Sequence, residues 1–257
     1  MEERQVDNKF AVQLYTVREE LKNEGIRTVF KKLKEMGWIA VQISALPQGY
    51  DREEVVQALK ENDLQVAGMH TSLQRMEEDL ESLLAEVDLY GTKDIVCPFL
   101  TEDLRNEAGY RRVKEILNRV AEQAPGYRIS YHNHAFEFET DIDGQDALSF
   151  ILDPANNSKI LAEIDVYWVK KAGHDPFQFI TDYANRMPII HLKDMTDDER
   201  QTFAEVGEGL IDFISILKWG EENGVEWYAV EQDVCERSPF DCLATSLQNL
   251  KAMAARL

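Results

Sequence analysis

The sequence lacks the features that mark disulfide-rich and membrane proteins. Its 257 residues include three cysteines, Cys97, Cys235 and Cys242, an odd number without the close spacing of a zinc site or the density of a disulfide scaffold. We interpret them as buried or incidental thiols. No run approaches the roughly 18 apolar residues of a membrane-spanning helix, so we expect no membrane partner.

Basic residues are also scarce. There are 28 Lys and Arg against 48 Asp and Glu, which gives a formal net charge of −20. No block of Lys or Arg interrupts this acidic background to form a groove for phosphates, so a nucleic-acid partner is not expected. The acidic surface favours solubility, and its field attracts cations.

Targeting signals and domain linkers are missing as well. The first ten residues, MEERQVDNKF, are charged and lack the apolar core of a signal peptide, so we expect a cytoplasmic protein. With 44% apolar residues the chain can bury a sizeable core, and no low-complexity or Pro/Gly/Ser-rich stretch divides it. We therefore predict a single domain over residues 1–257.

Short apolar runs alternate with longer segments of helical periodicity. Eight runs are predicted to be strands: 9–15, 38–44, 64–70, 93–99, 127–134, 159–166, 188–193 and 226–233. Helical patterns lie between them, for example over 28–37, 51–62 and 211–224. Four glycines, Gly37, Gly91, Gly126 and Gly224, precede strands, as left-handed helix caps do.

Eight strand–helix units in a chain near the typical length of about 250 residues indicate an α/β fold, a single (β/α)₈ TIM barrel. The alternative is an open, doubly wound sheet. The first strand, however, is not followed by the Gly-rich phosphate turn typical of that fold.

Catalytic groups in such barrels lie at the carboxyl ends of the strands. Polar residues occur at these ends: His70, His132, His134, Asp165, His191 and Glu231. Any one of these histidines is explained by an ordinary buried hydrogen bond, but four together with two carboxylates indicate a site.

A buried carboxylate must be protonated, paired with a cation or bound to a metal. Asp165, His191 and Glu231 come from three neighbouring strands, and imidazole with carboxylate suits Mn²⁺, Co²⁺, Mg²⁺ or Zn²⁺. The structural alternative for Asp165 and Glu231 is an ion pair with Lys193 or a helix N-cap. Glu163, two residues before Asp165, is expected one layer deeper, holding a ligand or Lys193.

Several motifs carry a family resemblance over essentially the whole chain: QLYTVR, YHNHAFEFE, EIDVYWVKKAGHDP, HLKDM, FAEVGEGLIDF and VEQDVCERSPF. They resemble the sugar phosphate isomerase/epimerase family of xylose-isomerase-like barrels. That superfamily includes inosose dehydratases, ketose 3-epimerases and apurinic-site endonucleases, so the fold is more specific than the substrate. The resemblance implies a divalent metal held by Glu, Asp, His and Glu from strands five to eight. Asp165, His191 and Glu231 match the last three.

The first metal ligand is left open by the sequence. The fifth strand ends in YHNH rather than in a glutamate, so either His132 or His134 replaces it, or Glu137 reaches back into the site. We favour Glu137 as the ligand, with His134 beside it, and keep the reverse as the alternative.

The chemistry expected of such a site begins with the loss of a proton next to a carbonyl. Candidate proton carriers are Glu163, His134, Lys193 and His70, although Lys193 is equally interpreted as a partner of a carboxylate. Substrate contacts are expected from Tyr15, His132 and Trp168.

The glycines of residues 205–213 precede a predicted helix. They are interpreted either as a phosphate-binding loop or as a tight turn with Asp212 near the helix start, and the turn is favoured because the loop has no Lys or Arg.

We therefore predict a divalent-metal-dependent isomerase or epimerase of a small sugar or polyol, with a keto-sugar or inosose dehydratase or hydratase as the alternative. A phosphoesterase is disfavoured by the acidic charge, and a catalytically silent sugar-binding barrel is the third reading. A homodimer is possible, but no interface can be read from the sequence.

Overall fold

Eight parallel strands form the centre of the molecule in the computed structural model, which describes residues 6–257. They are β1 (Phe10–Gln13), β2 (Ala40–Ile43), β3 (Gln65–His70), β4 (Asp94–Cys97), β5 (Arg128–His132), β8 (Leu161–Glu163), β9 (Ile189–Leu192) and β12 (Trp227–Val230). The order in the sheet is β8-β5-β4-β3-β2-β1-β12-β9. The TIM barrel and all eight strands expected from the sequence are confirmed.

The barrel closes where β8 meets β9. A parallel bridge joins Asp165 to His191. The His191 N–H donates to the carbonyl oxygen of Ile164 at 2.9 Å, and the Ala162 N–H donates to that of Arg186 at 2.9 Å. Closure thus brings a carboxylate and an imidazole together at the carboxyl-end rim.

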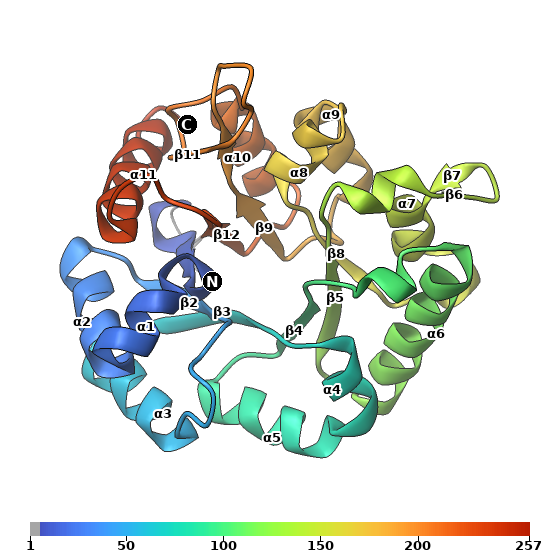
Figure 1. Ribbon diagram of the computed structural model, residues 1–257, viewed down its shortest axis with the longest axis horizontal. Helices are drawn as coiled ribbons and strands as arrows, with labels where there is room; N and C mark the ends of the chain where they lie inside the picture. Colours follow the sequence, from blue (N-terminus) through green and yellow to red (C-terminus); the bar gives the residue numbers. More distant parts are fainter. Residues whose placement is uncertain (1–5) are drawn as a thin grey trace.

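The helices form a ring around the strands (Figure 1). They are α1 (Arg18–Glu24), α2 (Ile26–Met36), α3 (Arg52–Glu61), α4 (Leu73–Glu78), α5 (Leu80–Tyr90), α6 (Glu107–Gln123), α7 (Ala147–Leu152), α8 (Val166–Lys171), α9 (Pro176–Ile180), α10 (Phe213–Glu222) and α11 (Pro239–Ala254). No helix within residues 6–257 is both long enough and apolar enough to cross a membrane.

Shorter elements lie in the connections. The 3₁₀ turns are η1 (Val6–Lys9), η2 (Leu14–Val17), η3 (Glu102–Leu104), η4 (Phe136–Glu139), η5 (Ala155–Asn157) and η6 (Thr181–Tyr183). Two small antiparallel pairs join β6 (Asp141–Ile142) to β7 (Gln145–Asp146) and β10 (Asp194–Met195) to β11 (Phe203–Ala204).

Helix α2 shows how the sequence pattern produces the outer layer. Its buried residues, Ile26, Val29, Phe30 and Leu33, recur at the three- and four-residue spacing that puts them on one face. The helix ends at Gly37, whose φ of +99° is left-handed and so favours glycine.

The barrel interior changes from apolar to polar along the strands. An alanine layer that includes the paired Ala11, Ala40 and Ala229 belongs to one buried apolar cluster with Ala67, Ile189 and Trp227. Because side chains two residues apart on a strand share a face, the next inward position after Ala11 is Gln13, after Ala40 is Gln42, and after Ile189 is His191. The polar layer therefore lies directly above the alanine layer, at the carboxyl ends.

Asp194 organises the glycine-containing loop. It is the second residue after the end of β9. Its carboxylate accepts hydrogen bonds from the backbone N–H groups of Met195, Gly207, Gly209 and Ile211 at 2.8 to 3.1 Å. A Cβ on Gly209 would lie 2.1 Å from the Met195 carbonyl oxygen, so this close approach needs glycine. The backbone amides of this loop are occupied by Asp194, which supports the turn rather than the phosphate loop.

Replacing Asp194 by Asn is expected to destabilise the protein. An amide has one acceptor oxygen instead of two, so some of the four backbone N–H groups lose their hydrogen-bond acceptor. We therefore expect the free energy of unfolding to fall by about 2–4 kcal/mol. Urea unfolding measures this loss. The matched control is Asp212→Asn, since Asp212 caps α10 through one exposed backbone N–H of Ser215 and its loss is expected to cost about 1 kcal/mol or less. Equal losses in the two variants would contradict this account.

Candidate active site

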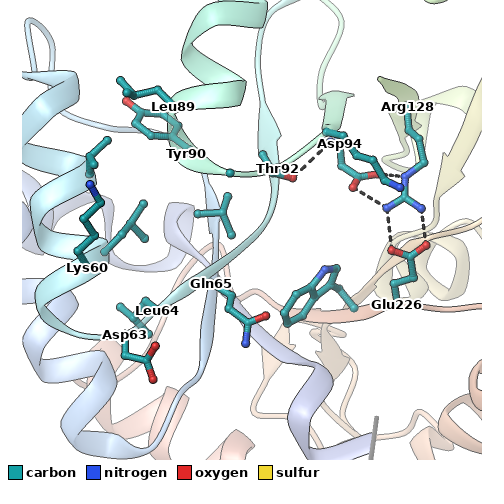
Figure 2. A pocket seen from close by; sticks show the side chains of 16 residues that line it. Lys60, Asp63, Leu64, Gln65, Leu89, Tyr90, Thr92, Asp94, Arg128 and Glu226 are labelled. Atoms are coloured by element: carbon teal, nitrogen blue, oxygen red, sulfur yellow. Dashed lines mark hydrogen bonds and ion pairs between the residues drawn. The ribbon is translucent and has the colours of Figure 1, made fainter. Parts of the chain in front are cut away.

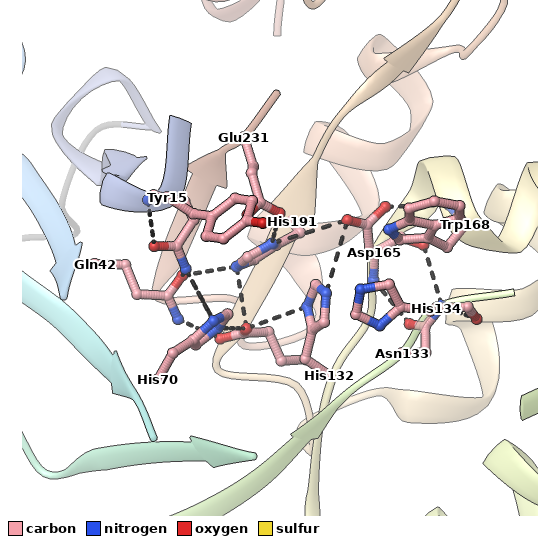
Figure 3. Close-up of polar contacts among 12 residues, drawn as sticks. Tyr15, Gln42, His70, His132, Asn133, His134, Asp165, Trp168, His191 and Glu231 are labelled. Atoms are coloured by element: carbon pink, nitrogen blue, oxygen red, sulfur yellow. Dashed lines mark hydrogen bonds and ion pairs between the residues drawn. The ribbon is translucent and has the colours of Figure 1, made fainter. Parts of the chain in front are cut away.

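Strand ends supply the polar side chains expected from the sequence. His70 and His132 are the last residues of β3 and β5, and His191 is the third residue of β9. Asp165 follows β8 by two residues and Glu231 follows β12 directly. All five point to the interior of the rim (Figure 3), and Asp165 and His191 are fully buried.

Four of these residues bring ligand atoms to one place. The ring nitrogens and carboxylate oxygens of His132, Asp165, His191 and Glu231 all lie within 4.8 Å of one another. His191 Nδ1 is 3.2 Å from Glu231 Oε2 and 3.9 Å from Asp165 Oδ2. His132 Nε2 is 4.0 Å from Asp165 Oδ2. The sequence prediction that Asp165, His191 and Glu231 converge agrees with this geometry.

Glu137 lies elsewhere, contrary to the expectation that it reaches back into the site. It belongs to η4, where Oε1 accepts from the Tyr131 hydroxyl at 2.8 Å and Oε2 accepts from the His134 backbone N–H at 2.8 Å. Tyr131 precedes His132 on β5 and therefore faces the opposite side of the strand. Burial raises the pKa of Glu137 to about 7. The residue of this segment that joins the cluster is His132, the alternative kept above.

Asp165 makes both structural interactions that the sequence suggested, a helix N-cap and an ion pair with Lys193. One of its carboxylate oxygens is still available to a metal ion. Its Oδ1 caps α8 by accepting from the backbone N–H groups of Tyr167 and Trp168 at 2.9 and 3.1 Å. Its Oδ2 is buried, makes no hydrogen bond, and lies 3.0 Å from Lys193 Nζ as an ion pair. A carboxylate oxygen has two lone pairs, so this ion pair leaves room for a further cation.

Lys193 is a fixed cation. Its Nζ lies 3.0 Å from Asp165 Oδ2, 2.9 Å from Glu231 Oε2 and 2.6 Å from Asp233 Oδ2. Burial alone would lower its pKa, but these carboxylates raise that pKa well above the usual value. Lys193 therefore stays charged at neutral pH.

The two central imidazoles differ in charge. Burial, together with the neighbouring charge of His191, lowers the pKa of His132 to about 3, so its ring is neutral at pH 7. Burial also opposes a charge on His191, but the carboxylates of Glu163 and Glu231 raise its pKa to about 10. Burial raises the pKa of Asp165 to about 6 although Lys193 opposes the rise.

This arrangement fits a divalent cation. Nitrogen and oxygen donors converge on one volume, and the buried Asp165 Oδ2 has no hydrogen-bond donor. His132, Asp165, His191 and Glu231 are the residues that could hold the ion, and their mixed chemistry suits Mn²⁺, Co²⁺, Mg²⁺ or Zn²⁺.

A cavity of about 670 Å³ opens above the cluster. Its walls are Tyr15, Ser44, Ala45, His70, Thr71, Ser72, Pro98, Phe99, Thr101, His132, His134, Trp168, Glu231 and Asp233. Tyr15 and Phe99 are 36% and 49% exposed at the rim. The three side chains expected to contact substrate, Tyr15, His132 and Trp168, all line this cavity.

A family model describes the chain from residue 30 to residue 252: the xylose isomerase-like TIM barrel. The chain belongs to this family.

Relatives of the xylose isomerase-like barrel agree with that assignment. An inosose dehydratase from Clostridium beijerinckii is 27% identical over 157 residues, which are 53% of this chain and 52% of the relative. The match thus spans about half the length of that relative.

Solved structures show the same fold. A sugar phosphate isomerase/epimerase from Parabacteroides distasonis has a TM-score of 0.79 at 21% identity, covering 96% of this chain and 94% of that one. An L-ribulose 3-epimerase has a TM-score of 0.73 at 13% identity, covering 96% and 95%. At these identities the likeness concerns the fold.

A larger cavity of about 800 Å³ lies at the amino ends of the strands (Figure 2). There Arg128 pairs with Asp94 at 2.6 Å and with Glu226. Because catalytic groups of TIM barrels come from the carboxyl ends, the smaller cavity at the other end of this xylose isomerase-like barrel is the candidate active site.

The sequence analysis did not single out three polar residues of the site. Gln13 and Gln42 are fully buried below the cluster, and Asp233 lines the cavity. A signal was present for each of them: Gln13 and Gln42 interrupt apolar strands, and Asp233 is two residues after Glu231.

Binding of Zn²⁺ to the ion-free protein is expected to release protons. At pH 7.5 His191 is protonated, because its pKa is about 10, and coordination displaces about one proton per ion. At pH 5.5 Asp165, with its pKa of about 6, adds to the release, which rises toward about two. Calorimetric titrations in buffers of different ionisation enthalpy measure this number.

The control for this titration is Asp165→Asn. If the variant still binds Zn²⁺, its release should stay near the pH 7.5 value when the pH falls to 5.5. Binding by the wild type at pH 7.5 without any proton release would show that His191 is not a ligand.

Proposed function

We propose that this protein is a divalent-metal-dependent enzyme that removes a proton next to a carbonyl of an unphosphorylated sugar or polyol and returns it, as an isomerase or epimerase. The observation that carries the proposal is the convergence of His132, Asp165, His191 and Glu231 below a cavity walled by further imidazoles. In the donor set, His132 takes the place first expected for Glu137.

The ion supplies one part of the chemistry: it stabilises the negative charge that develops on a substrate oxygen when the neighbouring C–H loses its proton. Lys193 adds a fixed positive charge next to the carboxylates of Asp165 and Glu231 and holds both in place.

Of His70 and His134, only His134 is a proton carrier in this proposal, because both ring nitrogens of His70 are hydrogen-bonded, to Gln13 and to Glu163. The two histidines flank His132, with ring centroids 5.4 and 5.2 Å from it, and both line the cavity (Figure 3). Burial holds the pKa of His134 well below its usual value, so its ring is neutral and able to accept a proton. Return of the proton to a neighbouring carbon on the same face of the substrate needs only this one carrier.

Glu163 and Lys193 were also candidate proton carriers from the sequence, but in this proposal they have another role. Glu163 is fully buried below the cluster and does not line the cavity. Lys193 stays charged among three carboxylates. We assign both to holding the site rather than to proton transfer.

Aromatic side chains shape the cavity for a sugar. Tyr15, Phe99 and Trp168 lie on its walls, where an aromatic face can stack on the apolar face of a sugar ring and exclude water. Hydroxyl groups of Ser44, Thr71 and other wall residues supply partners for substrate hydroxyls.

Dehydration is the second candidate, and the similarity to an inosose dehydratase favours it. The first step is the same, but a β-hydroxyl then leaves with a proton from an acid. His134 would supply that proton.

Deuterium exchange tests the proposal. Metal-loaded protein incubated in D₂O with a panel of keto-sugars and inososes should exchange the proton next to the carbonyl of at least one compound. Asp165→Asn and Glu231→Gln should lower the exchange rate by about 100-fold or more, because each removes a charge from the donor set.

The matched controls are Asp212→Asn and Glu222→Gln, which change the same residue types at two exposed positions at the start and end of α10 that do not line the cavity, and should exchange at the wild-type rate. Exchange without loss of water supports isomerisation or epimerisation, and loss of water supports the lyase. Unchanged exchange in both site variants would contradict the proposal, and absence of exchange with every compound would favour a sugar-binding barrel.

Phosphorylated substrates should be poor. The cavity walls include no Lys or Arg among the described residues, two of them are carboxylates, and Asp194 occupies the loop amides. For matched pairs of sugar and sugar phosphate we expect kcat/KM to be at least about tenfold lower for the phosphate. A preference for the phosphate would refute this part of the proposal.

A further inference from the structure

A buried polar layer lies below the proposed metal ligands. Gln13 from β1, Gln42 from β2 and Glu163 from β8 are each fully buried, although uncharged polar and ionised groups are expensive to bury. Gln42 is hydrogen-bonded to both Gln13 and Glu163 and also contacts His191 (Figure 3). The direction of these hydrogen bonds decides which His191 nitrogen carries a hydrogen.

Glu163 sets the direction of the first bond. Its Oε1 lies 2.5 Å from His70 Nε2 and 3.0 Å from His191 Nε2, so the carboxylate serves as the acceptor among these nitrogens. Its Oε2 lies 2.5 Å from one end of the Gln42 amide. That end must be the NH₂ group, which leaves the Gln42 carbonyl oxygen pointing away from Glu163.

The Gln42 carbonyl oxygen then decides which ring nitrogen of His191 carries a hydrogen. It accepts from Gln13 Nε2 at 2.9 Å and lies 2.6 Å from His191 Nε2. A carbonyl oxygen cannot donate, so His191 Nε2 must carry the hydrogen. The other acceptor near Nε2 is Glu163 Oε1 at 3.0 Å, which requires the same hydrogen.

His70 fits the same assignment. Its Nδ1 is 3.1 Å from the donating Gln13 Nε2, and its Nε2 is 2.5 Å from Glu163 Oε1. Gln13 is held in turn by the Tyr15 backbone N–H, which donates to its Oε1 at 3.3 Å. The shorter Gln13 contact and the Glu163 contact of His70 are thus both satisfied when His70 carries its hydrogen on Nε2.

The layer also resembles a second cation site, because ligand atoms of His70, His132, Glu163 and His191 lie within 4.8 Å of one another. The hydrogen positions argue against that reading. The Nε2 hydrogens of His70 and His191 point at Glu163 Oε1, so these nitrogens have no lone pair for an ion.

We propose that Gln13, Gln42 and Glu163 are positioning residues that keep hydrogen on His191 Nε2 and so present Nδ1, the nitrogen facing Asp165 and Glu231, as the metal ligand. The inference rests on the proposed function, since it concerns the same cation. Partners behind a ligating histidine commonly change metal affinity by about 10–100-fold when they are lost.

Nitrogen NMR tests the hydrogen position directly. The protein labelled with ¹⁵N-histidine is loaded with Zn²⁺, and long-range ¹H–¹⁵N correlations of the imidazole rings are recorded, with His191→Asn used for assignment. We expect His191 to show a protonated Nε2 and a coordinated Nδ1. In Glu163→Gln an amide can donate to Nε2, so we expect the protonated fraction of Nε2 to fall and Zn²⁺ affinity to drop by about 10–100-fold.

The matched control is Glu222→Gln on the exposed side of α10, which should leave spectrum and affinity unchanged. Because Glu163→Gln can fail to fold, Gln42→Met is the second variant, with Gln57→Met on the exposed face of α3 as its control. Gln42→Met removes the 2.6 Å acceptor but keeps Glu163, so a smaller change in the same direction is expected.

Three results would separate the possible failures. Coordination through Nε2, with hydrogen on Nδ1, would overturn the inference and leave the metal site intact. Two Zn²⁺ ions per chain, one lost in His70→Asn, would overturn it in favour of the second cation site. If no Zn²⁺ binds, the proposed function fails, and ring spectra of the ion-free protein above pH 10 still support or refute hydrogen on Nε2.

Discussion

Burying several ionised groups in one layer of the barrel is the constraint on which the rest of the site depends. An isolated charge in a protein interior costs several kcal/mol, and here Glu163, Asp165 and Glu231 are all inside. Lys193 and His191 supply the compensating charge at hydrogen-bonding distance. Removing one member leaves its partners buried and unpaired, so the site depends on all of them together.

The barrel makes this concentration of charge possible through simple geometry. Side chains alternate along each strand, so small Ala11 and Ala40 form a tightly filled layer and the positions two residues later form the polar one. The turns after the strands then add what the strands cannot: α8 begins at Asp165, whose cap interaction aims Oδ2 inward. Fold and site therefore use the same residues.

Much of the architecture could be predicted from the sequence, because the spacing of apolar residues in strands and helices reflects which side chains are buried. All eight strands were found, and the strand-end rule located His70, His132, His191 and Glu231. Glu137 points away from the cluster because its direction depends on a 3₁₀ turn, and a turn of this kind leaves no periodic pattern. The choice between His132 and Glu137 follows from three-dimensional placement alone.

Gln13 and Gln42 were overlooked for a different reason. An amide inside an apolar strand has no charge to attract notice, and its importance depends on partners from distant strands, such as Glu163. Likewise, the loop glycines suggested a possible anion site, whereas the anion that binds them is the chain's own Asp194.

The bridge between Asp165 and His191 also holds the barrel closed. The strip of strands becomes a cylinder where β8 meets β9, and Asp165 and His191 at that seam lie buried in the cluster below the cavity. An ion held by this pair would therefore act on the seam itself. Amide exchange at Ala162 and His191, whose N–H groups donate across the seam, would register such occupancy as a tighter cylinder, even without turnover.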